Sequence, residues 1–333
     1  MSYEKEKQVA IAAAVTAAQL CEQVRRDLPE AMEKTDKSPV TVADYGSQAV
    51  ICTTLAREFP DDPLVAEENA TALRELEMTD QLTKVTCYVN ELIAEATPKS
   101  VLEWIDRGCG DVGPRYWTLD PIDGTKGFLR QEQYAIALAL VEGGDVKVGV
   151  LACPALPLES GEIGALFVAV RGSGATVQPL SGGEARVIHV QRGEDPTYFR
   201  LIESVESSHG DSDLQNQVAL AAGITAPSLQ MDSQAKYGVV ALGQAAVYMR
   251  LPSPKNPDYR ENIWDHAAGA IIVEEAGGRV TDMYGEPLNF SLGRKMLNNR
   301  GVIASNGIIH PRLLSVLQEK TKIVKFCKEE ENK

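Results

Sequence analysis

Apolar positions that recur at helical spacing predict several helices along the chain. Over residues 4–28, apolar side chains lie three or four positions apart, and Pro29 follows. This pattern predicts a helix that ends before the proline. A second helix is expected with Asp44 as its N-cap and an end before Pro60. Further helical patterns cover residues 80–95, 99–107, 211–222, 265–276 and 310–325.

Short apolar runs bounded by turn residues predict the strands between these helices. The runs cover residues 64–66, 116–119, 134–141, 146–153, 163–170, 175–180, 187–191, 201–204 and 246–251. Two of them are joined by Gly143, Gly144 and Asp145, which is typical of a β-hairpin. The order of elements predicts an α+β N-terminal domain, residues 1–157, and an α/β C-terminal domain, residues 158–333.

The length of the chain agrees with two domains, and its charge limits the kinds of partner that it can bind. The chain has 333 residues, more than a single hydrophobic core usually supports. Hydrophobic residues make up 44% and charged residues 24%, as in globular proteins. A net charge of −14 argues against nucleic acid as a partner. A phosphorylated substrate would therefore need bound cations or a few local basic residues.

The N-terminal residues and the cysteines bear on where the protein works. The chain begins MSYEKEK, without the features of a secretory signal or a transit peptide. We therefore expect a cytoplasmic protein with no membrane partner, while an organellar form stays open. A monomer is also expected, although no feature of the sequence determines the oligomeric state. The six cysteines include no C-x-x-C pair, so free thiols are expected and a regulatory disulfide stays open.

Residues 120–125, with the sequence DPIDGT, combine two carboxylates with residues that bend the chain. Proline fixes one backbone angle and Gly124 permits a sharp turn, so Asp120 and Asp123 can converge on one point. The carbonyl of Ile122 can face the same point. Such oxygen ligands suit Mg²⁺, and the amide groups after Gly124 open a helix that favours phosphate. Asp-Pro and Asp-Gly are also common in turns, so the segment alone leaves an ordinary turn open.

Other carboxylates lie at the ends of predicted elements. Glu67 and Glu68 follow a predicted strand at its C-terminal end, where ligand sites tend to lie. Asp265 begins a strongly apolar helix, as Asp44 begins an earlier one. Each alone is equally an acidic loop or a plain N-cap. Together with residues 120–125 they favour a phosphatase with two or three metal ions, whose charge offsets the repulsion between carboxylates.

Six motifs resemble known phosphatases over nearly the whole chain. Three of them resemble the lithium-sensitive, magnesium-dependent phosphomonoesterases, which include inositol monophosphatase and fructose-1,6-bisphosphatase: residues 67–68, 120–125 and 264–269. Three more resemble the 3′(2′),5′-bisphosphate nucleotidases of plants and fungi: residues 37–48, 117–130 and 232–237. The resemblance implies a two-domain, layered αβαβα sandwich, with the site at the domain junction.

The resemblance also implies a role for each candidate residue. Two or three Mg²⁺ ions would be bound by Glu67, Asp120, Ile122, Asp123 and Asp265. Asp44 and Thr125 would orient and deprotonate the attacking water, while Gly124 and Thr125 would hold the scissile phosphate. The nucleotide and its second phosphate would be bound by His209, Ser233, Lys236 and Arg250. For the lysine and the arginine, ordinary surface charge is the alternative.

The activity implied is hydrolysis of the 3′-phosphate of adenosine 3′,5′-bisphosphate to AMP, with 3′-phosphoadenylyl sulfate as a second substrate and inhibition by Li⁺ and Na⁺. Two alternatives stay open: an inositol phosphate phosphatase and a non-catalytic sensor of nucleotide or metal. Three departures from the family pattern concern the substrate. Asn69 stands where Asp is usual, Ser212 stands where a second histidine is frequent, and the loop over residues 157–161 is short.

Overall fold

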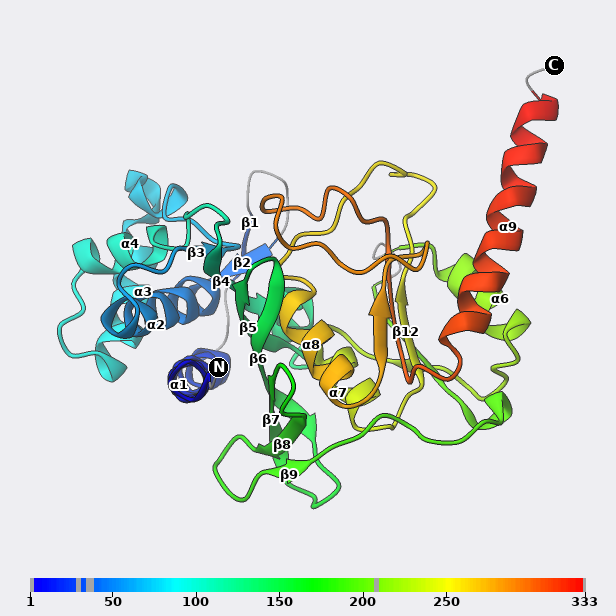
Figure 1. Cartoon of the computed structure of the whole chain (residues 1–333). Coiled ribbons are helices and arrows are strands. Elements are labelled where there is room, and N and C mark those ends of the chain that lie inside the picture. Colours follow the sequence, from blue (N-terminus) through cyan, green and yellow to red (C-terminus); the bar gives the residue numbers. More distant parts are fainter. Residues whose placement is uncertain (1–2, 28–30, 34–38, 207–209, 332–333) are drawn as a thin grey trace.

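Two β-sheets alternate with three layers of helices (Figure 1). The structure is a computed structural model that describes residues 3–27, 31–33, 39–206 and 210–331. From left to right in Figure 1, the layers are α1 with α2, a seven-stranded sheet, α7 with α8, a five-stranded sheet, and α6 with α9. This αβαβα order confirms the predicted fold class.

The seven-stranded sheet is antiparallel except at one edge, where β3 runs parallel to β4. Its strands, in spatial order, are β3 (Leu64–Ala66), β4 (Arg115–Asp123), β5 (Ala135–Glu142), β6 (Asp145–Pro157), β7 (Ile163–Val170), β8 (Ala175–Pro179) and β9 (Arg186–Val187). The hairpin of β5 and β6 pairs Glu142 with Asp145. Gly143 and Gly144 between them have φ angles of 65° and 79°, which a tight hairpin turn requires. The predicted hairpin is confirmed.

The five-stranded sheet is mixed, with β10 parallel to β11 and β12, and β14 antiparallel to β12 and β13. Its strands, in spatial order, are β11 (Leu229–Gln230), β10 (Leu201–Glu203), β12 (Val247–Arg250), β14 (Val302–Ser305) and β13 (Arg279–Thr281). A two-stranded ribbon, β1 (Ala31–Glu33) and β2 (Pro39–Thr41), precedes α2.

The sheets divide the chain later than the predicted domain boundary at residue 157. That boundary falls between β6 and β7, which pair in one sheet, and β8 and β9 extend the same sheet. We propose that any domain boundary lies between the two sheets, within residues 188–200. The strands on either side of residue 157 pair as neighbouring hairpins, so the change in composition after this residue does not mark the end of the sheet.

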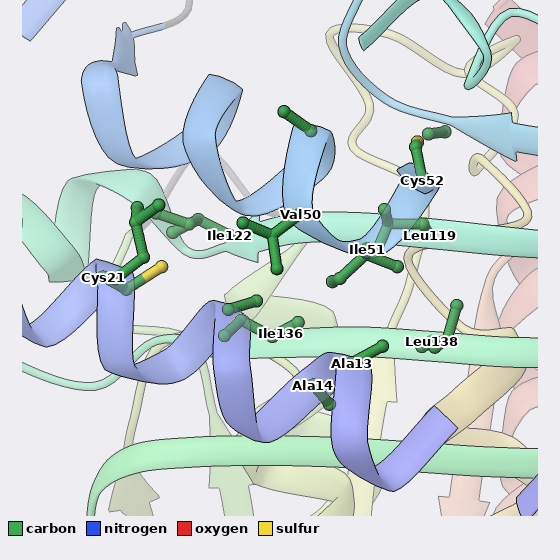
Figure 2. Packing of buried hydrophobic residues seen from close by; sticks show 14 of the residues in the cluster. Ala13, Ala14, Cys21, Val50, Ile51, Cys52, Leu119, Ile122, Ile136 and Leu138 are labelled. Atoms are coloured by element: carbon green, nitrogen blue, oxygen red, sulfur yellow. The ribbon is translucent and has the colours of Figure 1, made fainter. Parts of the chain in front are cut away.

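Small side chains let the first helices pack closely on the seven-stranded sheet. The buried face of α1 (Glu4–Arg26) carries Ala10, Ala13, Ala14, Ala17 and Ala18. In α2 (Val42–Glu58), a Cβ at Gly46 would lie 2.8 Å from Leu20, so glycine permits this approach of the two helices. Figure 2 shows Val50 and Ile51 of α2 in one cluster with Ile136 of β5. The two predicted N-terminal helices are confirmed, although the first ends at Arg26.

The middle layer, α7 (Ala235–Ala241) and α8 (Ala267–Glu275), contacts both sheets. A Cβ at Gly149 of β6 would lie 2.3 Å from Ile271 of α8, and one at Gly269 would lie 2.3 Å from Tyr237 of α7. Glycine at these two positions therefore lets α8 approach the sheet and its neighbouring helix. The other helices are α3 (Thr79–Leu92), α4 (Pro98–Asp106), α5 (Thr125–Leu129), α6 (Ser212–Ala221) and α9 (His310–Glu331). Among the described residues, no helix is both long and apolar enough to cross a membrane.

Candidate active site

A cavity of about 440 Å³ lies where the end of β4 meets the segments before α7 and α8. Its volume is in the range of small-molecule sites. The predicted residues that it brings together are Glu67, Asp120, Ile122, Asp123, Gly124, Thr125, Ser233, Lys236, Arg250 and Asp265. Asp44 joins them through a hydrogen bond to Thr125. His209 lies outside the described residues.

A break in strand register directs both aspartates of β4 toward the cavity. Asp120 pairs with Ala137 but Asp123 pairs with Ala135, so three steps on β4 match two on β5. In a regular strand, residues three apart face opposite sides, and a bulge removes this alternation. Gly124 follows with a φ of 88°, and a Cβ there would lie 2.9 Å from Ser233. The turn therefore needs glycine for its backbone angle and for its close contact.

The carbonyl of Ile122, and not its side chain, faces the site. The side chain is buried in the core beside Val50 (Figure 2). The hydroxyl of Thr125 lies 3.2 Å from the Ile122 carbonyl oxygen and 3.2 Å from Asp44 Oδ1. A carbonyl, a hydroxyl and a carboxylate therefore meet at the start of α5.

Asp44 is fixed by the beginning of α2. Its Oδ2 accepts hydrogen bonds from the Thr41 backbone amide at 2.8 Å and from the Thr41 hydroxyl at 2.5 Å. Thr41 is the N-cap, so the prediction that Asp44 is the N-cap is wrong. The helix starts earlier because Thr41 and Asp44 bond each other reciprocally in a capping box. This arrangement leaves Asp44 Oδ1 directed at Thr125.

Glu67 and Asp265 reach the cavity from opposite halves of the fold. The Glu67 amide donates to the Leu119 carbonyl at 3.2 Å, which places it beside Asp120. Asp265 Oδ2 accepts from Asn262 Nδ2 at 3.3 Å. α8 begins at Ala267 with His266 as N-cap, so the prediction that Asp265 begins this helix is wrong by two residues, and the alternative of a plain N-cap is excluded. The aspartate precedes the helix and is available to the cavity.

Burial raises the pKa of two of these carboxyl groups. It raises that of Asp265 to about 8, against the opposing effect of Arg250. It also raises the pKa of Asp123, against Lys236 and Arg250. Buried oxygen donors that resist ionisation fit a divalent cation, because its charge keeps them ionised. The carboxylates that line the cavity form an acidic wall that can therefore hold a metal ion: Glu67, Asp120, Asp123 and Asp265.

A second group of potential ligands overlaps with this wall. Within the described part of the chain, ligand atoms of Glu261, Asp265 and His266 lie within 4.8 Å of one another. Glu261 already pairs with Arg250 Nε at 2.9 Å and lies 3.3 Å from His266 Nε2. The other ring nitrogen of His266 is 2.7 Å from the Tyr237 hydroxyl. These contacts engage the histidine and Glu261, whereas Asp265 lines the cavity.

Two cations also line the cavity. Lys236 is 3% exposed, and its Nζ donates to the Met231 carbonyl at 3.1 Å. Burial lowers the pKa of Lys236 to about 8, and its Nζ lies 5.2 Å from the centre of the Tyr248 ring. Arg250 is held by Glu261. Neither side chain has the environment of an ordinary surface charge.

Gln234 is a site residue that the sequence analysis missed. Its backbone amide donates to Asp123 Oδ2 at 2.7 Å, and its side chain donates to the Trp264 carbonyl at 2.9 Å. Its Oε1 accepts from the Gly269 amide at 3.3 Å. One residue thus connects the end of β4 with the segment that carries Asp265. Its place between Ser233 and Lys236 was the signal that could have identified it.

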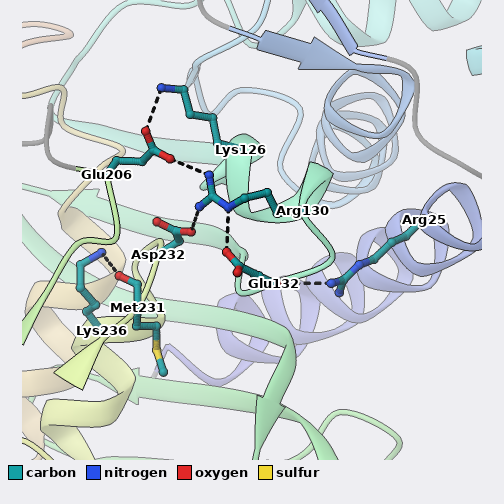
Figure 3. Close-up of polar contacts among 8 residues, drawn as sticks. All are labelled: Arg25, Lys126, Arg130, Glu132, Glu206, Met231, Asp232 and Lys236. Carbon is teal, nitrogen blue, oxygen red and sulfur yellow. Dashed lines mark hydrogen bonds and ion pairs between the residues drawn. The ribbon is translucent and has the colours of Figure 1, made fainter.

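Arg130 is a second residue that was missed, and it joins three segments near the cavity mouth (Figure 3). Its guanidinium pairs with Glu206 at 2.5 Å, with Glu132 at 2.7 Å, and with Asp232. Lys126 pairs with Glu206 at 3.2 Å. The network ties the end of α5 to the turn before α7. Glu206 and Asp232 lie 76 and 102 positions from Arg130, so no local pattern indicates these two pairs.

Comparisons with protein families, with curated proteins and with solved structures all lead to the same family. Residues 2–322 match the Inositol monophosphatase family. A 3′(2′),5′-bisphosphate nucleotidase of Oryza sativa is 43% identical, over 96% of this chain and 95% of the relative. One of Emericella nidulans is 40% identical, over 97% of this chain and 100% of the relative. Among solved structures, the IMPase of Thermotoga maritima has a TM-score of 0.66 and 25% identity, over 96% of this chain and 99% of that chain.

Proposed function

Because the chain belongs to the inositol monophosphatase family, we propose that it hydrolyses the 3′-phosphate of adenosine 3′,5′-bisphosphate to give AMP and phosphate. We also propose 3′-phosphoadenylyl sulfate as a second substrate. Relatives at 40% to 43% identity over nearly the full length are named as 3′(2′),5′-bisphosphate nucleotidases. A cytoplasmic location and a monomeric state stay predictions.

The observation that carries this proposal is a cavity that is lined by both carboxylates and cations. The carboxylates and the Asp44–Thr125 pair meet there with Lys236 and Arg250. A substrate with two phosphates can place the phosphate that is cleaved at the carboxylates, through bound metal, and the other phosphate at the cations. Tyr248 and Tyr259 also line the cavity and offer aromatic rings to a nucleobase.

We propose that the acidic wall holds two or three Mg²⁺ ions, through Glu67, Asp120, Asp123, Asp265 and the Ile122 carbonyl. All of these are oxygen donors, the ligands that Mg²⁺ prefers. Bound Mg²⁺ would polarise the phosphoryl group and lower the pKa of water. The protein residues supply orientation and proton transfer around that chemistry.

The Asp44–Thr125 pair is suited to act on the attacking water. The Thr125 hydroxyl donates to Asp44 Oδ1, so its oxygen can accept a hydrogen bond from a water in the cavity. As the water attacks phosphorus, its proton moves through Thr125 to Asp44, and the bond between phosphorus and the ribose 3′-oxygen breaks. The leaving 3′-oxygen takes a proton from solvent water. Amide groups at Gly124 and Thr125 would hold the phosphate that leaves the nucleotide.

The function is tested by measuring phosphate release from four substrates in Mg²⁺, with and without Li⁺. They are adenosine 3′,5′-bisphosphate, 3′-phosphoadenylyl sulfate, inositol 1,4-bisphosphate and inositol 1-phosphate. Preference for the two nucleotides with inhibition by Li⁺ supports the proposal. Preference for an inositol phosphate would replace the substrate assignment, and no turnover would indicate the non-catalytic sensor.

Lys236→Met should raise KM for adenosine 3′,5′-bisphosphate by about 10- to 100-fold, because a charge-assisted hydrogen bond contributes about 1.5–3 kcal/mol. For adenosine 3′-phosphate, which lacks the second phosphate, we expect KM to stay within about threefold of wild type. Steady-state kinetics on both substrates checks this. Lys255→Met, at an exposed lysine outside the cavity, is the matched control. An equal rise in KM for both substrates would contradict this role of Lys236.

A further inference from the structure

Arg294 lies in the segment between β13 and β14 and makes three contacts that converge on the acidic wall. Its guanidinium donates from Nη2 to the carbonyl of Ala66. The same group lies over the ring of Trp264, 4.8 Å from the ring centre. Its backbone carbonyl accepts from the Ile263 amide at 3.0 Å. Arg294 itself is outside the set of residues that line the cavity.

The two residues that the guanidinium contacts each directly precede a carboxylate of the site. Ala66 ends β3 and is followed by Glu67, whereas Trp264 is followed by Asp265. These two carboxylates come from opposite halves of the fold. One planar guanidinium therefore contacts both segments that carry them, one through the Ala66 carbonyl and the other through the Trp264 ring, a geometry that lysine cannot reproduce with a single point charge.

The two residues after Arg294 also bind the segment that carries Asp265. Lys295 forms a β-bridge with Asn262, and its Nζ donates to Asn262 Oδ1 at 3.1 Å. The amide of Met296 donates to the Glu261 carbonyl at 2.9 Å. Asn262 in turn donates to Asp265. Residues 294–296 thus brace the segment before α8 along its length.

We propose that Arg294 is a positioning residue that sets the distance between Glu67 and Asp265, and thereby the affinity of the site for divalent cations. The proposal rests on the metal-dependent function proposed above. Arg294 acts through the two backbone segments and touches neither the substrate nor the reacting atoms. Its loss therefore weakens metal binding and leaves the reaction nearly unchanged once the metal is saturating.

The test measures metal binding directly, by titrating the full chain with Mn²⁺ and following free Mn²⁺ by electron paramagnetic resonance. Arg294→Met should raise Kd for Mn²⁺ by about 10- to 100-fold, as is usual for residues that orient metal ligands. The Mg²⁺ concentration for half-maximal activity should rise by the same factor. At saturating Mg²⁺, kcat should stay within about threefold of wild type.

Two further variants keep the test decisive. Arg294→Lys retains the charge but loses the planar contact with Trp264, and we expect Kd for Mn²⁺ to rise about 3- to 10-fold. Arg192→Met, at an exposed arginine, is the control and should bind Mn²⁺ as wild type does. Wild-type Kd in either Arg294 variant that folds would overturn the positioning role. Failure of the wild-type protein to bind Mn²⁺ or turn over substrate would overturn the proposed function instead.

Discussion

Asp123→Asn is expected to lower kcat/KM for adenosine 3′,5′-bisphosphate on the order of 10³-fold, with the remaining activity requiring more Mg²⁺. The carboxylate lines the cavity beside the other proposed ligands, and losing one such electrostatic contact costs several kcal/mol in the transition state. Asparagine has nearly the same shape and its carbonyl can still accept from the Gln234 amide. The loss should therefore reflect charge and not a changed fold.

Thermal denaturation distinguishes loss of the Asp123 charge from a change of fold in Asp123→Asn. Burial raises the pKa of Asp123, so the ionised group is unfavourable in the metal-free protein, and its removal should not lower the metal-free Tm. Mg²⁺ should raise Tm of wild type but raise that of Asp123→Asn much less, because a ligand stabilises only the state that binds it. Asp80→Asn, at an exposed aspartate of α3, is the control. More than a tenth of wild-type activity at unchanged Mg²⁺ dependence would exclude Asp123 as a ligand.

Thr125→Val should lower kcat by about 10²- to 10⁴-fold with little change in KM, the range for loss of general acid–base catalysis. Valine fills the same volume but lacks the hydroxyl that bonds Asp44. Thr125→Ser should restore most of the activity, since it keeps the hydroxyl. Steady-state kinetics at saturating Mg²⁺ provides the measurement.

Combining Thr125→Val with Asp44→Asn tests whether the two residues act on one proton. If they do, the double variant should be little worse than either single variant, because the effects of residues that act as a unit are not additive. If the losses in kcat of the two single variants multiply in the double variant, the two residues do not share a proton path. Asp44→Asn should in addition cost about 1 kcal/mol of folding stability, because it weakens the cap of α2, whereas Thr125→Val should not.

Local elements were predictable because their signals are local. Hydrophobic periodicity identified the strand at residues 163–170 and most of the longer helices, but not α7, and the glycines of the β5–β6 hairpin marked its turn. The N-caps were less predictable because Thr41 and Asp44 are both good caps. Only the backbone angle, extended at Thr41, shows which one begins the helix.

The candidate site was predictable where its residues follow one another and unpredictable where they come from distant segments. Residues 120–125 carry their bend and their oxygen ligands together. Gln234 lies 111 positions from Asp123, and Arg294 lies 228 positions from Ala66. Such contacts depend on how the two sheets meet, which no local pattern in one sequence records. The membership of β7, β8 and β9 in the seven-stranded sheet was missed for another reason, because the change in composition after residue 157 indicated a domain boundary although these strands pair with their neighbours in sequence.

The helix layer between the sheets limits how the protein can move. α7 and α8 contact both sheets, with Gly149 and Gly269 allowing close approach on either side of α8. Hinge motion between two bodies needs a thin connection, but here rotation would break two helix–sheet interfaces at once. We therefore expect substrate to enter and product to leave through shifts of side chains and short loops, such as opening of the Lys126–Glu206 pair, without closure of one half on the other. The geometry of the proposed site would then be set when the chain folds, and turnover would not wait for a slow conformational change.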